Sequence, residues 1–140
     1  MLMPFHLAIP VKNLVESRKF YSDLLQLEEG RSSDSWIDYN FYGHQLVIHL
    51  KSEYFDSLQN NLSNLVDGHG VPIPHFGMVL EWGDWENLAR KLDGYVDFKI
   101  KPYIRFQGQV GEQGTFFFLD PSGNALEFKA FKNLDTLFAK

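Results

Sequence analysis

The segment "FFFLDPSGNALEFKAF" (residues 116–131) decides how this chain folds. It opens with an apolar run that is typical of a strand, and Asp-Pro-Ser-Gly-Asn is typical of a turn. In the second strand, alternation puts Ala125, Glu127, Lys129 and Phe131 on one face and apolar side chains on the other. The segment therefore predicts two strands joined by a turn, with the carboxylate of Glu127 on the more polar face.

The two halves of the chain follow the same order of elements. "FHLAIPV" (5–11) and "HFGMVLEW" (75–82) each read as a strand, and each is followed by a helical pattern and then by further strands. Those later strands are expected within 35–50 in the first half, with a turn at Gly43-His44, and around 97–100, 103–110 and 114–120 in the second. The repeat measures about 70 residues. We predict one domain, residues 1–140, with module one at about 1–52, a connector at about 53–73 and module two at about 74–140.

Capping residues mark the expected helices. Asn13 followed by Glu16 is typical of a helix start, Asp84 is the expected cap of the second helix, and Gly94 should end that helix. One face of the first helix would carry Ser17, Phe20, Tyr21, Leu24 and Leu25, and the apolar face of the second Trp85, Leu88, Ala89 and Leu92. A short connector helix would carry Phe55, Leu58, Leu62 and Leu65.

The composition excludes several classes of function. The chain has 140 residues, no cysteine and a formal net charge of -5. Without cysteine it has no disulfides and no thiolate chemistry, so any metal must be held by His, Asp, Glu, Asn or water. Its charge offers no footprint for nucleic acid or anionic membranes. Since no signal peptide or bilayer-spanning segment is recognisable, we expect a soluble cytoplasmic protein.

Two histidines begin the first strand of each half. His6 and His75 occupy the same place in the repeat, so a pseudo-twofold axis relating the modules would bring both imidazoles together. Taken alone, each histidine could equally be a partly buried strand-edge residue that is hydrogen-bonded to the backbone. The matched placement of the two histidines favours a metal site. Glu127 is the obvious third ligand and His49 the fourth candidate. His44, in the expected hairpin turn, and His69, in the connector, are expected to be exposed.

These residues resemble the vicinal oxygen chelate superfamily of glyoxalases, bleomycin-resistance proteins and extradiol dioxygenases. The resemblance runs from residue 5 to 131 through "FHLAIPVKN", "SRKFYSDLL", "PHFGMVL" and, most specifically, residues 116–128. It implies an α+β fold of two paired βαβββ modules, whose sheets curl around a cleft with one divalent metal. The implied ligands are His6, His75 and Glu127, with His49 where glyoxalase-like members usually have a glutamate. The superfamily also suggests a homodimer, because pairing covers sheet edges.

The resemblance leaves three kinds of chemistry open. A dioxygenase would use Fe²⁺ or Mn²⁺ on two His and one carboxylate, which leaves positions for substrate oxygens and O₂. The tyrosine of extradiol enzymes, however, is replaced here by Phe117, which cannot donate a proton. A glyoxalase-, epimerase- or lyase-like enzyme would use Zn²⁺, Ni²⁺ or Co²⁺ (or Mn²⁺) as a Lewis acid, with Glu112 as the base. A metal-containing small-molecule-binding protein of the resistance type is the third reading.

Three further residues are candidates for contact with a small-molecule substrate. Arg105 in "YIRFQGQ" could hold a carboxylate or phosphate through a bidentate fork. Gln113, like Gln109, lies in the region where the resemblance to extradiol enzymes implies a histidine that assists the reaction without binding the metal, and Phe41 could form part of an apolar cleft wall. A surface arginine and a core phenylalanine are the plainer alternatives for Arg105 and Phe41.

Overall fold

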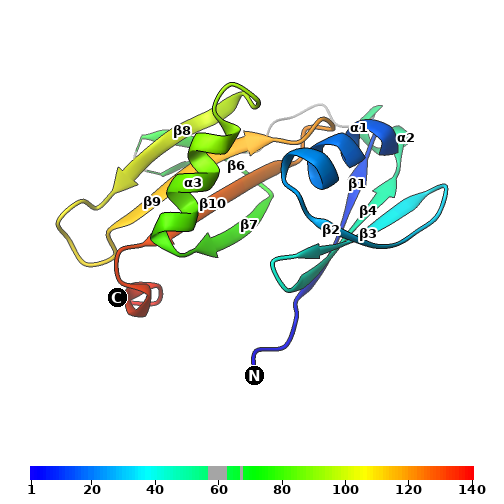
Figure 1. Cartoon of the computed structure of the whole chain (residues 1–140). Coiled ribbons are helices and arrows are strands. Elements are labelled where there is room, and N and C mark those ends of the chain that lie inside the picture. The colour runs from blue at the N-terminus through cyan, green and yellow to red at the C-terminus, as the bar shows by residue number, and fades with distance from the viewer. Residues whose placement is uncertain (57–62, 67) are drawn as a thin grey trace. The chain divides into compact units, whose positions relative to one another are not determined.

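The computed structural model describes residues 1–56, 63–66 and 68–140 (Figure 1). The chain divides into two compact units, each considered separately below. Unit 1 comprises Met1–Asn60 and Asp120–Asn124, and unit 2 comprises Asn61–Leu119 and Ala125–Lys140. Each unit contains a four-stranded mixed sheet, curled and not closed, with few helices. The predicted α+β class is therefore confirmed.

Unit 1 contains the first sheet, in the order β1-β4-β3-β2. Its strands are β1 (His6–Val11), β2 (Glu28–Ser32), β3 (Trp36–Phe41) and β4 (His44–Leu50), and its helices are α1 (Leu14–Arg18), the π-helix η1 (Lys19–Leu24) and α2 (Ser52–Asp56). β1 runs parallel to β4, and the other pairs are antiparallel. The buried side chains Tyr21 and Tyr39 touch at a ring distance of 5.6 Å, which packs η1 on one face of the sheet.

Unit 2 contains the second sheet, in the order β7-β10-β9-β8. Its strands are β7 (His75–Leu80), β8 (Phe98–Arg105), β9 (Gln113–Leu119) and β10 (Ala125–Phe131), and the helices are α3 (Trp82–Leu92) and the short η2 (Leu134–Thr136). A two-stranded sheet of β5 (Ser63–Val66) and β6 (His69–Pro72) precedes them. The helix α3 lies across the large sheet (Figure 1), and buried Trp85 donates to the carbonyl of Phe128 at 2.9 Å.

The internal repeat is confirmed by these strand orders. In each unit a first strand pairs in parallel with a last strand, β1 with β4 and β7 with β10, and the remaining two follow antiparallel. The parallel pairs β1–β4 and β7–β10 also have known registers. His6 lies opposite Gln45 and His75 lies opposite Ala125, so equivalent positions in the two units can be compared directly.

Several local predictions are confirmed and others are wrong. The Asn13 side chain accepts from the Glu16 amide at 3.0 Å, as a helix cap does, and Gly94 follows the end of α3 with φ +81°. Asp84 does not cap α3, because the helix begins one turn earlier, after Glu81. The strand expected at 103–110 ends at Arg105, because the chain turns through Phe106 with φ +53°.

The hairpin and the connector also differ from expectation. The turn is Tyr42-Gly43, both with positive φ, and His44 is the first residue of β4, paired with Phe41. In the connector, the described residues include a helix at Ser52–Asp56, and Leu65 lies in β5, opposite Gly70. Leu58 and Leu62 lie outside the described residues.

The Asp-Pro-Ser-Gly-Asn turn is a structural element of unit 1. The Asp120 carboxylate accepts from the Tyr21 hydroxyl at 2.8 Å, from the Asn124 side chain and from the amides of Ser122 and Asn124. The Asn124 side chain also donates to the carbonyl of Pro10. The motif that most clearly signals the family therefore stabilises the fold, while Glu127 follows it on β10. Among the described residues, no helix is long and apolar enough to cross a bilayer.

Candidate metal-binding site

The register of β7 and β10 brings His75 and Glu127 together in unit 2. Gly77 lies opposite Glu127, and a Cβ on Gly77 would be 1.5 Å from the Glu127 carbonyl oxygen, so only glycine permits this approach. The His75 Nε2 atom is 3.1 Å from Oε2 of Glu127. The Glu127 carboxylate is only 8% exposed. Since buried carboxylates need a charged or hydrogen-bonding partner, the other contacts of Glu127 decide its state.

Glu127 is held as a carboxylate by three neighbours. The Thr115 hydroxyl donates to its Oε1 atom at 2.7 Å, and the Lys129 ammonium lies 3.4 Å from the same oxygen. Burial raises the pKa of Glu127, but His75, Lys129 and Thr115 together outweigh burial, so the net pKa lies below its ordinary value. The carboxylate is therefore negatively charged at neutral pH.

His75 presents its Nε2 atom to that carboxylate. Its Nδ1 atom lies 2.6 Å from the carbonyl oxygen of Pro72, and because a carbonyl can only accept, Nδ1 carries a proton. The ring of Phe117 packs edge-on against the imidazole, with ring centres 5.0 Å apart. The Glu127 carboxylate raises the pKa of His75, although partial burial opposes this effect. When the imidazole is protonated, its Nε2–H faces the Glu127 carboxylate, where a cation could take the place of the proton.

His6, the expected partner of His75, lies in unit 1 and is exposed. Its Nδ1 atom is 2.8 Å from Oε1 of Gln45, and the Gln45 amide nitrogen donates to both oxygens of Asp38, at 3.1 and 3.2 Å. His6, Gln45 and Asp38 come from β1, β4 and β3, and all three point to one face of the sheet. Sequence reasoning assigned no role to Asp38 or Gln45; strand alternation with the correct register would have indicated both.

His49 lies near the end of β4, on the face of Gln45 and Val47, as expected, but the repeat register does not match it to Glu127. Ala8 pairs with Val47 just as Gly77 pairs with Glu127, so Val47 is the unit 1 counterpart of Glu127. His49 lies two residues further along β4, opposite Pro10 and Trp36. Its role as an auxiliary ligand stays a prediction, without support from the position of Glu127 in the repeat.

The polar face of unit 2 continues from Glu127 toward two of the candidate substrate contacts. Gln113 and Thr115 lie on the same face of β9, and Gln113 pairs with Arg105 of β8. Gln113 is 8% exposed; its amide nitrogen donates to the Gly111 carbonyl, and its Oε1 atom has no hydrogen-bond partner among the described residues. Arg105 is half-buried, with its guanidinium over the ring of Phe106.

Two other candidates take structural positions. The Glu112 carboxylate accepts from the Gly108 amide at 3.3 Å and so closes the turn after β8. Phe41 is 5% exposed and lies, by alternation, on the face of the first sheet that carries buried Ile37 and Tyr39, opposite to His6. A buried ring on the core face is not available to a substrate, so we leave Phe41 out of the site proposed below.

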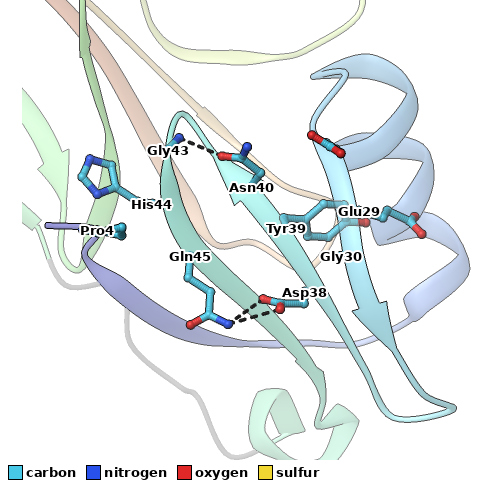
Figure 2. Close-up of a pocket in the computed structure, with 10 residues that line it drawn as sticks. Pro4, Glu29, Gly30, Asp38, Tyr39, Asn40, Gly43, His44 and Gln45 are labelled. Atoms are coloured by element: carbon cyan, nitrogen blue, oxygen red, sulfur yellow. Dashed lines mark hydrogen bonds between the residues drawn. The ribbon is translucent and has the colours of Figure 1, made fainter.

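Unit 1 also contains an open depression of about 410 Å³ beside β2, β3 and β4 (Figure 2). Its lining includes Glu28, Asp38, Asn40, His44 and Gln45. Figure 2 shows the Gln45 amide directed at the Asp38 carboxylate on this wall. The Asn40 side chain instead accepts from the Gly43 amide and supports the β3–β4 turn.

The imidazole and carboxylate of the pair His75–Glu127 are of the kind that bind divalent cations, and this pair would provide two ligand atoms. Within the part of the chain that the structure describes, no group of three or more His, Asp or Glu side chains gathers at one point. Metal–ligand distances of about 2.0–2.2 Å separate adjacent ligand atoms by about 3 Å, and the 3.1 Å between His75 and Glu127 matches this spacing.

Comparisons with known proteins agree with this fold. The family model "Glyoxalase/Bleomycin resistance protein/Dioxygenase superfamily" matches residues 4–128. A glyoxalase/bleomycin resistance protein/dioxygenase from Alicyclobacillus acidocaldarius is 32% identical, with a TM-score of 0.77 over 96% of this chain and 95% of that one. No curated protein matches the sequence.

Two more distant solved structures share the fold. The fosfomycin resistance protein FosX from Listeria monocytogenes is 20% identical, with a TM-score of 0.69 over 97% of this chain and 98% of that one. Lactoylglutathione lyase from Agrobacterium tumefaciens is 16% identical, with a TM-score of 0.66 over 100% and 97%. Together with the family match, the two sheets and their repeat lead to one conclusion: the chain belongs to the glyoxalase/bleomycin resistance protein/dioxygenase superfamily.

Proposed function

We propose that the chain is a metal-dependent enzyme that acts on a small substrate with two neighbouring oxygen atoms. His6, His75 and Glu127 would hold one divalent ion. The observation that carries the proposal is the contact in unit 2, where a buried, charged carboxylate faces the Nε2 atom of an imidazole whose Nδ1 is already engaged by a carbonyl. Metal-binding histidines characteristically use their second nitrogen in this way.

The residues around Glu127 hold its carboxylate in one orientation, which supports a role as a metal ligand. Thr115 donates to one carboxylate oxygen, so the other oxygen, Oε2, is the one that faces His75. A hydrogen bond from a fixed hydroxyl orients a ligating carboxylate and reduces the freedom it would lose on binding. His6 is the third ligand in this proposal because it occupies the place of His75 in the repeat.

The first reaction class to consider is a dioxygenase-like one. Two His and one carboxylate leave open positions on one side of an ion. Bound there, Fe²⁺ or Mn²⁺ would polarise the neighbouring oxygens of a substrate and allow it to react with O₂. In this proposal Arg105 and Gln113 contact the substrate from the polar face of β8 and β9.

A redox-neutral reaction of the glyoxalase, epimerase or lyase type is the second candidate, with Zn²⁺, Ni²⁺ or Co²⁺. The observation that favours it is Phe117, which is 2% exposed and packs against His75. A phenyl ring there cannot supply the proton that extradiol chemistry takes from a tyrosine. Glu112, or Lys129 at 3.4 Å from the Glu127 carboxylate, would then be the group that moves a proton. A protein that grips its ligand through the metal without turnover is the third reading.

We further propose a homodimer and a cytoplasmic location. The edge strand β2 is exposed along its whole length, and pairing with a second copy would cover such an edge.

Metal analysis of protein purified without chelators tests the proposal. We expect about one divalent ion per chain, lost in His6→Ala, His75→Ala and Glu127→Ala but kept in His69→Ala. His69 is a suitable control because it is an exposed strand histidine whose ring contacts Tyr103. Wild-type metal content in Glu127→Ala would reject the site.

Oxygen consumption then separates the reaction classes. Metal-free protein is loaded anaerobically with Fe²⁺ or with Zn²⁺ and offered a panel of catechols and 2-hydroxy carbonyls. Oxygen uptake with the Fe²⁺ form alone supports a dioxygenase, and product without oxygen uptake supports a Lewis-acid enzyme. Stoichiometric ligand binding without product supports the binding protein.

A further inference from the structure

We infer that Gln45 and Asp38 are positioning residues that hold His6 in one tautomer, with the proton on Nδ1 and the lone pair on Nε2. The inference rests on the proposed function for its purpose, since Nε2 is the atom that would bind the ion. The geometry itself belongs to unit 1 alone and involves one side chain from each of β1, β4 and β3.

The Asp38 carboxylate determines the orientation of the Gln45 amide. A carboxylate only accepts hydrogen bonds, and both of its oxygens lie within 3.1–3.2 Å of the same Gln45 nitrogen. The amide nitrogen therefore faces Asp38, and the amide oxygen faces His6. The reversed amide would put an oxygen against the two carboxylate oxygens and lose both contacts.

The orientation of Gln45 in turn determines the His6 tautomer. The Gln45 oxygen is 2.8 Å from Nδ1 of His6, and an amide oxygen can only accept. Nδ1 must then carry the proton, and in the neutral imidazole Nε2 holds the lone pair that a metal requires. If the amide turned over, its nitrogen would donate a hydrogen bond to Nδ1, and the neutral imidazole would then carry its own proton on Nε2, which in that form cannot bind a metal.

The two units reach the same result by different means. In unit 2 the carbonyl of Pro72 engages Nδ1 of His75, and a backbone carbonyl cannot reverse its polarity. In unit 1 the acceptor for Nδ1 of His6 is the side-chain amide of Gln45, and this amide could rotate by 180° and present its nitrogen instead. The two contacts of the Gln45 nitrogen with Asp38 prevent this rotation. Gln45 and Asp38 are exposed or half-buried on the wall of the depression in Figure 2, so water competes for these bonds and the double contact to Asp38 matters.

Nitrogen-15 NMR of histidine-labelled, chelator-treated protein tests the inference without any metal. Long-range proton–nitrogen correlations identify which ring nitrogen of His6 carries the proton, at a pH where the imidazole is neutral. We expect the Nδ1–H form in the wild type, and a shift toward the Nε2–H form in Gln45→Leu and in Asp38→Leu. Asn40→Leu, a change on the same wall without contact to His6, should leave the tautomer unchanged.

A double variant that moves the negative charge from position 38 to position 45 should restore the hydrogen-bond relay from residue 38 through residue 45 to His6. In the double variant Gln45→Glu with Asp38→Asn, the new carboxylate accepts from Nδ1–H and from the new amide, so the Nδ1–H form should return. Gln45 is exposed and Asp38 is half-buried, so the fold should tolerate the changes. An unchanged tautomer in Gln45→Leu, or the Nε2–H form in the wild type, would overturn the inference.

Metal titration distinguishes the inference from the proposed function. If both are right, Gln45→Leu weakens Zn²⁺ binding 10- to 100-fold, roughly the effect of removing an outer-shell partner, and the double variant restores it. A shifted tautomer with unchanged Zn²⁺ affinity supports the relay and rejects His6 as a ligand. An unshifted tautomer rejects the relay, whatever the metal affinity.

Discussion

The hydroxyl of Thr115 should determine both the stability of unit 2 and the quality of Glu127 as a ligand. Thr115 is 1% exposed, and its hydroxyl donates to Oε1 of Glu127 at 2.7 Å. Thr115→Val keeps the shape and the strand preference of the side chain but removes the donor. A hydrogen bond to a charged group contributes about 1.5–3 kcal/mol.

The remaining contacts of Glu127 set the expected loss near the middle of that range. After Thr115→Val, Oε1 keeps only the longer contact of 3.4 Å to Lys129, and the 8% exposure of Glu127 admits little water. We expect the free energy of unfolding to fall by about 2 kcal/mol. Urea denaturation of metal-free protein measures this change, and with a slope of about 2 kcal/mol/M the midpoint should fall by about 1 M.

Thr115→Ser is the matched control. It keeps the hydroxyl and loses one buried methyl, so it should cost only about 1 kcal/mol. Zn²⁺ affinity should weaken in the valine variant and stay near wild type in the serine variant, because only the first leaves Glu127 unoriented. A valine variant at least as stable as the serine variant would refute the reasoning.

Four further outcomes are expected. Gly77→Ala should unfold unit 2, seen by far-UV circular dichroism, because its Cβ would be 1.5 Å from the Glu127 carbonyl oxygen; Gly83→Ala in α3 meets nothing within 4 Å and should be neutral or stabilising by up to about 1 kcal/mol. Tyr21→Phe should lower the free energy of unfolding, measured by urea denaturation, by about 2 kcal/mol, because the buried Tyr21 hydroxyl donates to the Asp120 carboxylate. Tyr39→Phe, which removes a hydroxyl bonded to the neutral Ser22 hydroxyl, is the comparison, and equal losses in the two variants would argue against this account. In metal-free protein, the raised pKa of His75 contributes stability that is fully present below pH 6.5 and is lost as the pH rises through that raised pKa. The lowered pKa of Glu127 contributes stability that is fully present above pH 4.5 and is lost as the pH falls through that lowered pKa. The difference in the free energy of unfolding between wild type and His75→Gln should therefore peak between pH 4.5 and 6.5, and a difference that does not change with pH would contradict this account. Removing the ion with a chelator should lower the melting temperature of the wild type, by the equivalent of about 2.7 kcal/mol at a metal concentration 100 times Kd, and should not change that of Glu127→Ala.

Much of the fold could be predicted because it depends on neighbouring residues. The alternation around Glu127, the Asn13 cap and the order of elements in the two halves are local patterns, and the structure confirms them. The local errors have local causes. Asp84 is a residue type suited to a cap, but it lies inside the first turn of a helix that begins earlier, and Leu65 lies in a strand because it pairs with β6.

The amino-acid sequence alone specifies the strand patterns of the two halves, the repeat, and the functional groups that are present, which are imidazoles and carboxylates but no thiol. Tertiary structure decides which of these side chains meet. Thr115 reaches Glu127, Gln45 joins His6 to Asp38, and Val47, not His49, corresponds to Glu127, all through pairing between strands. Cross-strand register depends on packing and turn geometry across dozens of residues, and a shift of one residue would turn each of these side chains to the opposite face.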